Sequence, residues 1–174
     1  ALQKAADREI DVIGSHDYDR RGNRWALLRE LASTKPLWQT ECSFNAVDSS
    51  PDLIRSASEY WLFMTEAFND GVNLWQAYDW VYPPRQGGEA LIHLNWGQSY
   101  HCTKIYHGFR QWCAPLRPGM NVIRPELSGP AATGYSQAGV KSSAFLSADA
   151  KTLVIHVAAV QDQAADIEIQ IAAP

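Results

Sequence analysis

The sequence predicts an α/β fold in which a parallel sheet is followed by an antiparallel β region. In the first 82 of the 174 residues, strand patterns alternate with helical patterns. After Pro118-Gly119 the chain contains only short β patterns separated by Gly, Pro, Ser and Asp. Strand–helix–strand order favours parallel strands, whereas successive short strands favour antiparallel ones. The apolar fraction of 46% is sufficient for a packed core.

The parallel part is predicted to contain three strands. Residues 10–18 (IDVIGSHDY) begin apolar and β-rich and then become polar. Residues 36–42 (PLWQTEC), opened by Pro36, predict the second strand, and residues 72–78 (VNLWQAY) predict the third. We expect the three strands to lie side by side in one sheet.

Two helices are predicted between these strands, because apolar residues recur there at helical spacing. In residues 22–33 the apolar positions are Trp25, Leu28, Leu31 and Ala32. The second helix runs to about Asn69, and its apolar face consists of Leu53, Ala57, Tyr60, Trp61, Met64, Ala67 and Phe68. Residues 49–52 (SSPD) predict an N-cap and a proline in the first turn, and Gly71 predicts the end of the helix.

The second half of the chain is less regular. Pro83-Pro84 and Gly87-Gly88 predict a long loop, and residues 103–113 predict a short helix. Four strands are then expected at residues 120–124, 142–147, 152–159 and 166–171.

Composition excludes several classes of function. A net charge of −4 without a basic run argues against nucleic acid as a partner. The sequence contains no run of about 18 apolar residues, so no membrane span is predicted. His101, Cys102, His107 and Cys113 match no zinc-binding spacing, so no metal is expected. No glycine-rich phosphate loop or nucleophile elbow is present, and no cofactor is expected. Seven Trp and seven Tyr fit either a large core or a surface on which flat ligands stack.

Polar residues follow each of the three predicted strands. His16 and Tyr18 follow the first strand, Glu41 ends the second, and Trp80 follows the third. In parallel α/β sheets, ligands bind beyond the carboxyl ends of the strands. A carboxylate at the end of a buried strand is costly unless it has a partner or a chemical role. Glu41 is therefore a candidate catalytic residue, and the alternative is a structural carboxylate in an ion pair or a cap.

Four segments between residues 10 and 125 resemble glycoside hydrolase family 30, in the same order as in that family. PLWQTECS resembles the segment that carries the nucleophile, where a strand ends in Ser-Glu or Thr-Glu. IGSHDYD resembles the preceding strand end, which brings a His and an aromatic residue to the sugar. NLWQAYDWVYPP resembles the eighth strand of the bacterial xylanase-like members, and KIYHGFRQWCAPLRPGMNVIR resembles the return from the barrel to the β side domain.

The resemblance implies a fold more specific than α/β. Residues 1–117 would be the carboxyl-terminal part of a (β/α)8 TIM barrel of the xylanase and glucosylceramidase type, about strands six to eight. Residues 118–174 would be part of a β-sandwich side domain. The chain would then be a fragment whose partner is the missing amino-terminal half of the barrel, because a full barrel takes about 250 residues. The resemblance also implies an extracellular or periplasmic location.

The family implies a retaining mechanism on a β-linked oligo- or polysaccharide, with Glu41 as the nucleophile. The family's proton donor lies in an Asn-Glu pair, which this sequence lacks, so the isolated chain is expected to be nearly inactive. His16 would orient Glu41 and contact the sugar, Tyr18 and Tyr82 would contact substrate, and Trp80 would stack on a sugar ring. The rival hypothesis is a non-catalytic carbohydrate-binding or structural module, and an unrelated α/β domain is the third possibility.

Overall fold

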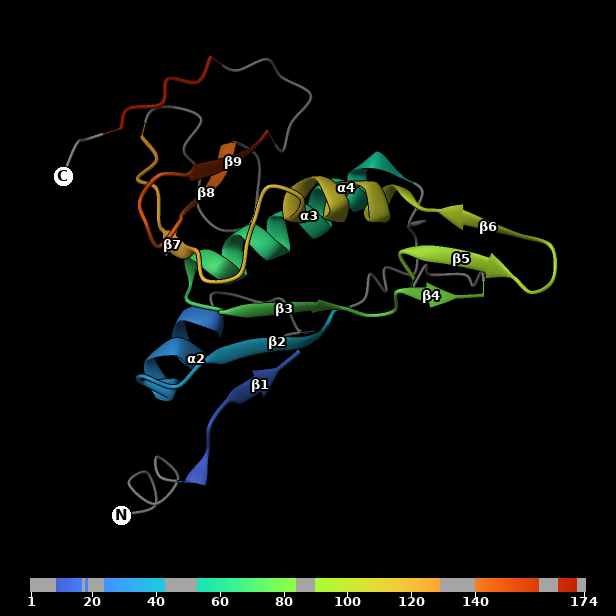
Figure 1. The fold of residues 1–174 in the computed structure, drawn as a ribbon, viewed down its shortest axis with the longest axis horizontal. Coiled ribbons are helices and arrows are strands. Elements are labelled where there is room, and N and C mark those ends of the chain that lie inside the picture. Colours follow the sequence, from blue (N-terminus) through green and yellow to red (C-terminus); the bar gives the residue numbers. More distant parts are fainter. Residues whose placement is uncertain are drawn as a thin grey trace.

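The computed structural model describes residues 9–16, 18, 24–42, 53–83, 90–128, 140–159 and 166–171. Within these residues the protein has a mixed α/β fold with three helices and three small sheets, each of three strands (Figure 1). The first sheet is parallel, the second mixed and the third antiparallel.

The first sheet contains β1 (Ile13–Ser15), β2 (Leu37–Cys42) and β3 (Leu74–Ala77), in that order and all parallel. The helix α2 (Arg24–Ala32) lies between β1 and β2 in the sequence, and α3 (Ile54–Asn69) lies between β2 and β3. The predicted strand–helix–strand–helix–strand order and its parallel pairing are therefore confirmed. The observed first and third strands are shorter than the predicted segments.

A small core fills the space between this sheet and its helices. It is formed by four buried residues: Trp25, Leu37, Ala67 and Val72. The prediction for Leu31 was wrong, since its side chain is 62% exposed. The helix α2 meets the core through Trp25 and Ala32, which lie seven residues apart on one face, and Leu31 falls outside that line.

The ends of α3 differ in how well they were predicted. The helix begins at Ile54 with Leu53 as N-cap, later than expected, and the cap predicted at 49–52 lies outside the described residues. The predicted stop at Gly71 is confirmed. Gly71 has φ +94°, and a Cβ on it would lie 2.5 Å from Cδ of Arg29, so only glycine fits there.

The helix α4 (Lys104–Cys113), predicted at 103–113, packs beside α3. A second core joins these helices to the rest of the molecule. Its buried members are Cys42, Tyr60, Met64, Leu91, Ile105, Trp112 and Phe145. Most of the predicted apolar face of α3 is buried, but Leu53 is 48% exposed at the amino end of the helix.

The third sheet contains β7 (Asn121–Ile123), β8 (Val140–Leu146) and β9 (Leu153–Ala159) and lies against α3. These strands match three of the four predicted β segments. The fourth prediction was wrong, because residues 166–171 form no strand. Ile167, Ile169 and Ile171 alternate as in a strand but are about half exposed or more, at 48%, 54% and 69%. A β pattern without a neighbouring strand to cover it does not form a ladder.

The second sheet contains β4 (Val81–Tyr82), β5 (Ile92–Asn95) and β6 (Ser99–Cys102). The loop predicted at Pro83-Pro84 and Gly87-Gly88 lies almost wholly outside the described residues. The antiparallel hairpin that β5 and β6 form after it was not predicted. Figure 1 shows this hairpin projecting beyond the arrowheads of β1, β2 and β3. No helix among the described residues is long and apolar enough to cross a membrane. No disulfide joins the three cysteines, all of which lie in described residues.

Candidate functional site

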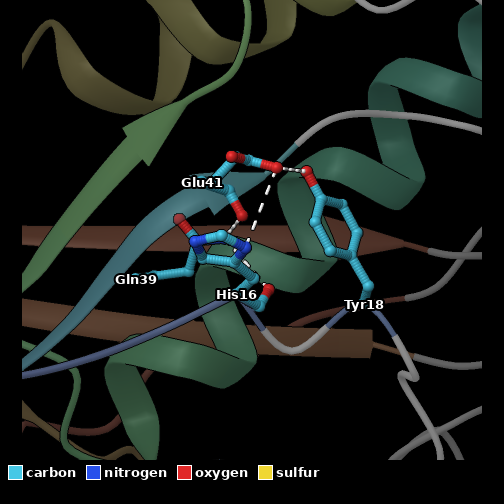
Figure 2. A network of polar contacts seen from close by, with 4 residues as sticks. All are labelled: His16, Tyr18, Gln39 and Glu41. Atoms are coloured by element: carbon cyan, nitrogen blue, oxygen red, sulfur yellow. Dashed lines mark hydrogen bonds and ion pairs between the residues drawn. The ribbon is translucent and has the colours of Figure 1, made fainter.

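The carboxyl ends of β1 and β2 bring Glu41, Tyr18 and His16 together. The hydroxyl of Tyr18 donates a 2.6 Å hydrogen bond to Oε1 of Glu41. Nδ1 of His16 lies 3.7 Å from the same oxygen, a distance that forms an ion pair only when the imidazole is protonated. Figure 2 shows both side chains directed at the carboxylate. The rings of His16 and Tyr18 meet edge to face, with centroids 5.7 Å apart.

The carboxylate of Glu41 is held at one oxygen only. Both contacts go to Oε1, and Oε2 makes no hydrogen bond or ion pair with any described residue. The side chain is 32% exposed, so solvent reaches it. A carboxylate fixed on one oxygen and open on the other can attack an electrophile, accept a proton or bind a hydroxyl.

An irregularity in β2 aims Glu41 away from the regular ladder. The pairing of β2 with β3 shifts register between Gln39 and Cys42, so Glu41 lies inside the shift. Such bulges change the direction of a side chain and are frequent beside active sites. The carbonyl of Cys42 anchors this strand end, since it accepts hydrogen bonds from the hydroxyl of Tyr60 at 3.1 Å and from the amide of Tyr78 at 2.9 Å.

Gln39 supports the site from beneath and was missed by the sequence analysis. Its side chain is fully buried, and its Nε2 donates to the backbone carbonyls of His16 and Glu41. One amide therefore links the ends of β1 and β2 at the two residues whose side chains converge (Figure 2). A polar residue in the predicted buried strand PLWQTEC was the available signal, because a buried amide requires partners.

Trp80 and Tyr82 lie on the segment that leaves the end of β3, apart from the three converging side chains. Trp80 is 55% exposed, and its ring packs edge-on against Phe109 with centroids 5.9 Å apart. Tyr82 belongs to β4, where it pairs with His93 of β5. The structure thus assembles Glu41, His16 and Tyr18, and it places the two predicted aromatic contacts next to the hairpin. Among the described residues, no three His, Cys, Asp or Glu side chains group as a metal site.

Comparison with known proteins gives structural matches only. No protein family model and no curated protein sequence matches this chain. The solved structure of SrfJ from Salmonella typhimurium aligns with a TM-score of 0.64 at 17% identity. The solved structure of an endo-beta1,6-glucanase aligns with a TM-score of 0.57 at 21% identity.

Each alignment covers 84% of this chain but 33% of the matched chain, so this chain spans about a third of the length of either protein. At these identities the matches report on fold rather than on chemistry. They show that the chain shares its mixed α/β fold with part of a glycoside hydrolase.

Proposed function

We propose that this chain is the carboxyl-terminal part of a retaining glycoside hydrolase, related to family 30, in which Glu41 is the nucleophile. One observation carries the proposal: Glu41 ends a parallel strand with Oε1 held by Tyr18 and Oε2 open. A nucleophilic carboxylate has to be oriented and yet leave one oxygen able to reach the anomeric carbon. The fold shared with part of an endo-beta1,6-glucanase supports the same class of reaction.

In the proposed architecture, β1, β2 and β3 are about strands six to eight of a (β/α)8 barrel. Two features support this assignment. The strands are parallel and adjacent, as barrel strands are. Leu27 and Leu31 of α2 are 56% and 62% exposed, which suits a helix that packs against the preceding unit of a barrel. The remaining strands and the proton-donating carboxylate would come from sequence outside this chain.

The reaction would proceed in two displacements. Oε2 of Glu41 attacks the anomeric carbon, the glycosidic C–O bond breaks, and the second carboxylic acid gives its proton to the departing oxygen. Water, deprotonated by that second carboxylate, then attacks the same carbon and releases Glu41. Tyr18 would hold Oε1 throughout, and the nearby imidazole of His16 would contact the sugar. Trp80 would stack on a sugar ring, and Tyr82 would contact another sugar unit of the substrate.

The neighbouring glucanase indicates the first substrate to test, a β1,6-linked glucan, with β1,4-xylan as the comparison polymer. A polymeric substrate of this kind is met outside the cytoplasm, so the proposal carries an extracellular or periplasmic location with it.

The test is made in the natural protein that contains this chain. Glu41→Gln should lower kcat on the order of a thousandfold or more, because a neutral amide cannot form the glycosyl ester. Glu59→Gln is the matched control, since Glu59 is a carboxylate on α3 paired with Arg55 at the surface. A mechanism-based inhibitor that esterifies the nucleophile should label the peptide containing Glu41, as read by mass spectrometry.

Wild-type turnover in the Glu41→Gln protein, or labelling of another carboxylate, contradicts the assignment of the nucleophile. Binding of oligosaccharide with neither labelling nor turnover favours the rival hypothesis, a carbohydrate-binding module.

A further inference from the structure

The turn of the β5–β6 hairpin is fixed by hydrogen bonds, and the hairpin is called the platform below. Its turn is closed by a 2.9 Å hydrogen bond from the amide of Gln98 to the carbonyl of Asn95. Gly97 in the turn has φ +77°, a conformation that glycine adopts readily. The side chains of Asn95 and Ser99, directly opposite each other, make a further contact of 3.4 Å. These contacts fix the backbone of the turn, which contains Trp96.

Two large aromatic side chains are displayed on this platform. Trp96 is 75% exposed, the highest value among the large apolar side chains of the described residues, and Tyr100 is 72% exposed. Tyr100 lies opposite Leu94 in the ladder, so the two side chains share one face of the hairpin. Exposed indole and phenol rings on a rigid turn are an unfavourable use of apolar surface unless a ligand or another part of the protein covers them.

The surroundings of these rings indicate a neutral, hydroxyl-bearing ligand. Residues 92–102 (IHLNWGQSYHC) contain no Asp, Glu, Lys or Arg. Apart from the two histidines His93 and His101, the hairpin therefore carries no side chain that could attract phosphate or an anionic membrane surface by its charge. Its exposed polar groups include the amides and hydroxyl of Asn95, Gln98 and Ser99 and the imidazole of His101, all of which can bond to sugar hydroxyls. Aromatic faces combined with amides and hydroxyls suit the C–H faces and the hydroxyl rim of a sugar ring.

The hairpin is continuous with the segment that leaves β3. The amide of Ile92 donates to the carbonyl of Trp80 at 2.9 Å, and the amide of Leu91 donates to that of Asp79 at 2.8 Å. At the other side, Thr103 bonds the carbonyl of Leu91 through both its amide and its hydroxyl, at 3.0 and 2.9 Å. From Ile92 to Trp96 the strand rises about 13 Å. Glu41 is next to the last residue of β2. Figure 1 shows the hairpin extending past the carboxyl ends of β1, β2 and β3.

We propose that Trp96 and Tyr100 form a remote subsite for a neutral β-glucan chain whose scissile bond lies at Glu41. The proposal rests on the glycosidase function given above and adds that the enzyme acts on a polymer rather than on a short glycoside. A polymer reaches both the carboxylate and the hairpin, whereas a short glycoside reaches only the carboxylate. Contact with the hairpin then adds binding free energy for the polymer alone.

The experiment uses Trp96→Ala and Tyr100→Ala, singly and together, in the natural protein that contains this chain. Binding of soluble β1,6-glucan is measured by gel retardation on the Glu41→Gln background, where no hydrolysis interferes. We expect each single variant to weaken retention by about fivefold and the double variant by more, in line with the loss of an aromatic contact. In the Glu41 protein, kcat/KM on the polymer should fall similarly, while kcat/KM on a short aryl glycoside should stay within about twofold.

Two control variants belong to this experiment. Trp96→Phe retains a ring at the same position and should keep most of the binding. Lys151→Ala removes an exposed polar side chain from the turn between β8 and β9, outside the hairpin, and should leave the ratio of polymer to short-substrate turnover close to that of the wild type. Thermal unfolding should be unchanged in all five variants, because the altered side chains are exposed.

Unchanged glucan retention in the double variant overturns the subsite. Equal losses on polymer and short glycoside also overturn it, since they would mean that the hairpin acts on the catalytic centre itself. Unchanged glucan binding with a changed oligomeric state assigns the rings to a protein contact instead. Failure of the glycosidase proposal is recognised separately, because it appears as full turnover in the Glu41→Gln protein whatever the hairpin variants do.

Discussion

The hydroxyl of Tyr18 lies 2.6 Å from Oε1 of Glu41, although 23 residues separate the two in the sequence. The contact forms because β1 and β2 are parallel neighbours, so that the residues following each strand end at the same edge of the sheet. It is shorter than the 3.7 Å approach of His16 to the same oxygen. In the resting protein, Tyr18 is therefore the principal side chain that orients Glu41.

The first prediction concerns this contact. Tyr18→Phe in the natural protein should lower kcat about tenfold with little change in KM, because hydrogen bonds to charged groups contribute about 1.5–3 kcal/mol and this one is partly exposed to solvent. The rate at which a mechanism-based inhibitor labels Glu41 should fall in parallel. Tyr106→Phe, which removes a phenol hydroxyl from α4, is the matched control. A Tyr18→Phe protein that labels at the wild-type rate would show that the contact has no role in reactivity.

The second prediction concerns Gln39. Gln39→Leu should destabilise the protein by about 1–3 kcal/mol, because it leaves the carbonyls of His16 and Glu41 without their buried donor. The loss is partly offset, since Oε1 of Gln39 is itself buried without a hydrogen bond from any described residue. Urea denaturation gives the stability, and inhibitor labelling of Glu41 at low temperature gives the positioning effect.

Gln98→Leu is the control for Gln39, since it makes the same substitution on the exposed hairpin turn. If the inhibitor labels Glu41 at the wild-type rate in a folded Gln39→Leu protein, Gln39 stabilises the fold but does not position Glu41.

The third prediction concerns acid stability. His156 of β9 is 6% exposed and lies among the rings of Trp61, Trp112 and Phe145. Burial lowers the pKa of His156 from 6.5 to about 4, and a backbone contact with Trp112 opposes this shift only in part. The unfolded chain therefore binds a proton at a pH where the folded protein does not. The contribution of the neutral imidazole is fully present above about pH 6.5 and is lost as the pH falls towards 4.

The expected loss from His156 over this interval is on the order of 3 kcal/mol in the free energy of unfolding. His156→Phe should flatten the pH dependence of urea denaturation between pH 6.5 and 4. His107→Phe, which replaces an exposed histidine of α4, should leave that dependence in place. If the free energy of unfolding of the His156→Phe protein falls with pH as steeply as in the wild type, the acid sensitivity arises from another residue.

The fourth prediction concerns Thr103, the N-cap of α4. Its hydroxyl accepts a 3.2 Å hydrogen bond from the amide of Tyr106 and donates to the carbonyl of Leu91. Thr103→Val preserves the shape and removes both contacts, and it should cost about 1–2 kcal/mol of stability. Because Leu91 precedes β5, amide exchange in the hairpin should also accelerate. Thr152→Val, at an exposed threonine between β8 and β9, should change neither quantity.

Several features were predictable because they depend on consecutive residues. The helical spacing of Tyr60, Met64 and Ala67 is a local property, and so is the need for glycine at position 71. The alternation of strands and helices then implies parallel pairing. Parallel pairing in turn places Glu41, His16 and Tyr18 at one edge of the sheet.

Tertiary structure decided the features that depend on distant residues. The register shift between Gln39 and Cys42, within which Glu41 lies, arises from the pairing of β2 with β3 and cannot be read from the sequence of β2 alone. Two further features depend on packing between distant parts of the chain. Tyr18 rather than His16 makes the shorter contact with Glu41, and His156 is buried. The hairpin was missed because its strands interrupt apolar positions with His, Asn and Ser. At residues 166–171 the error was the reverse, because a strand was predicted and none is present. Alternation of apolar residues does not form a strand without a neighbouring strand that supplies its hydrogen bonds.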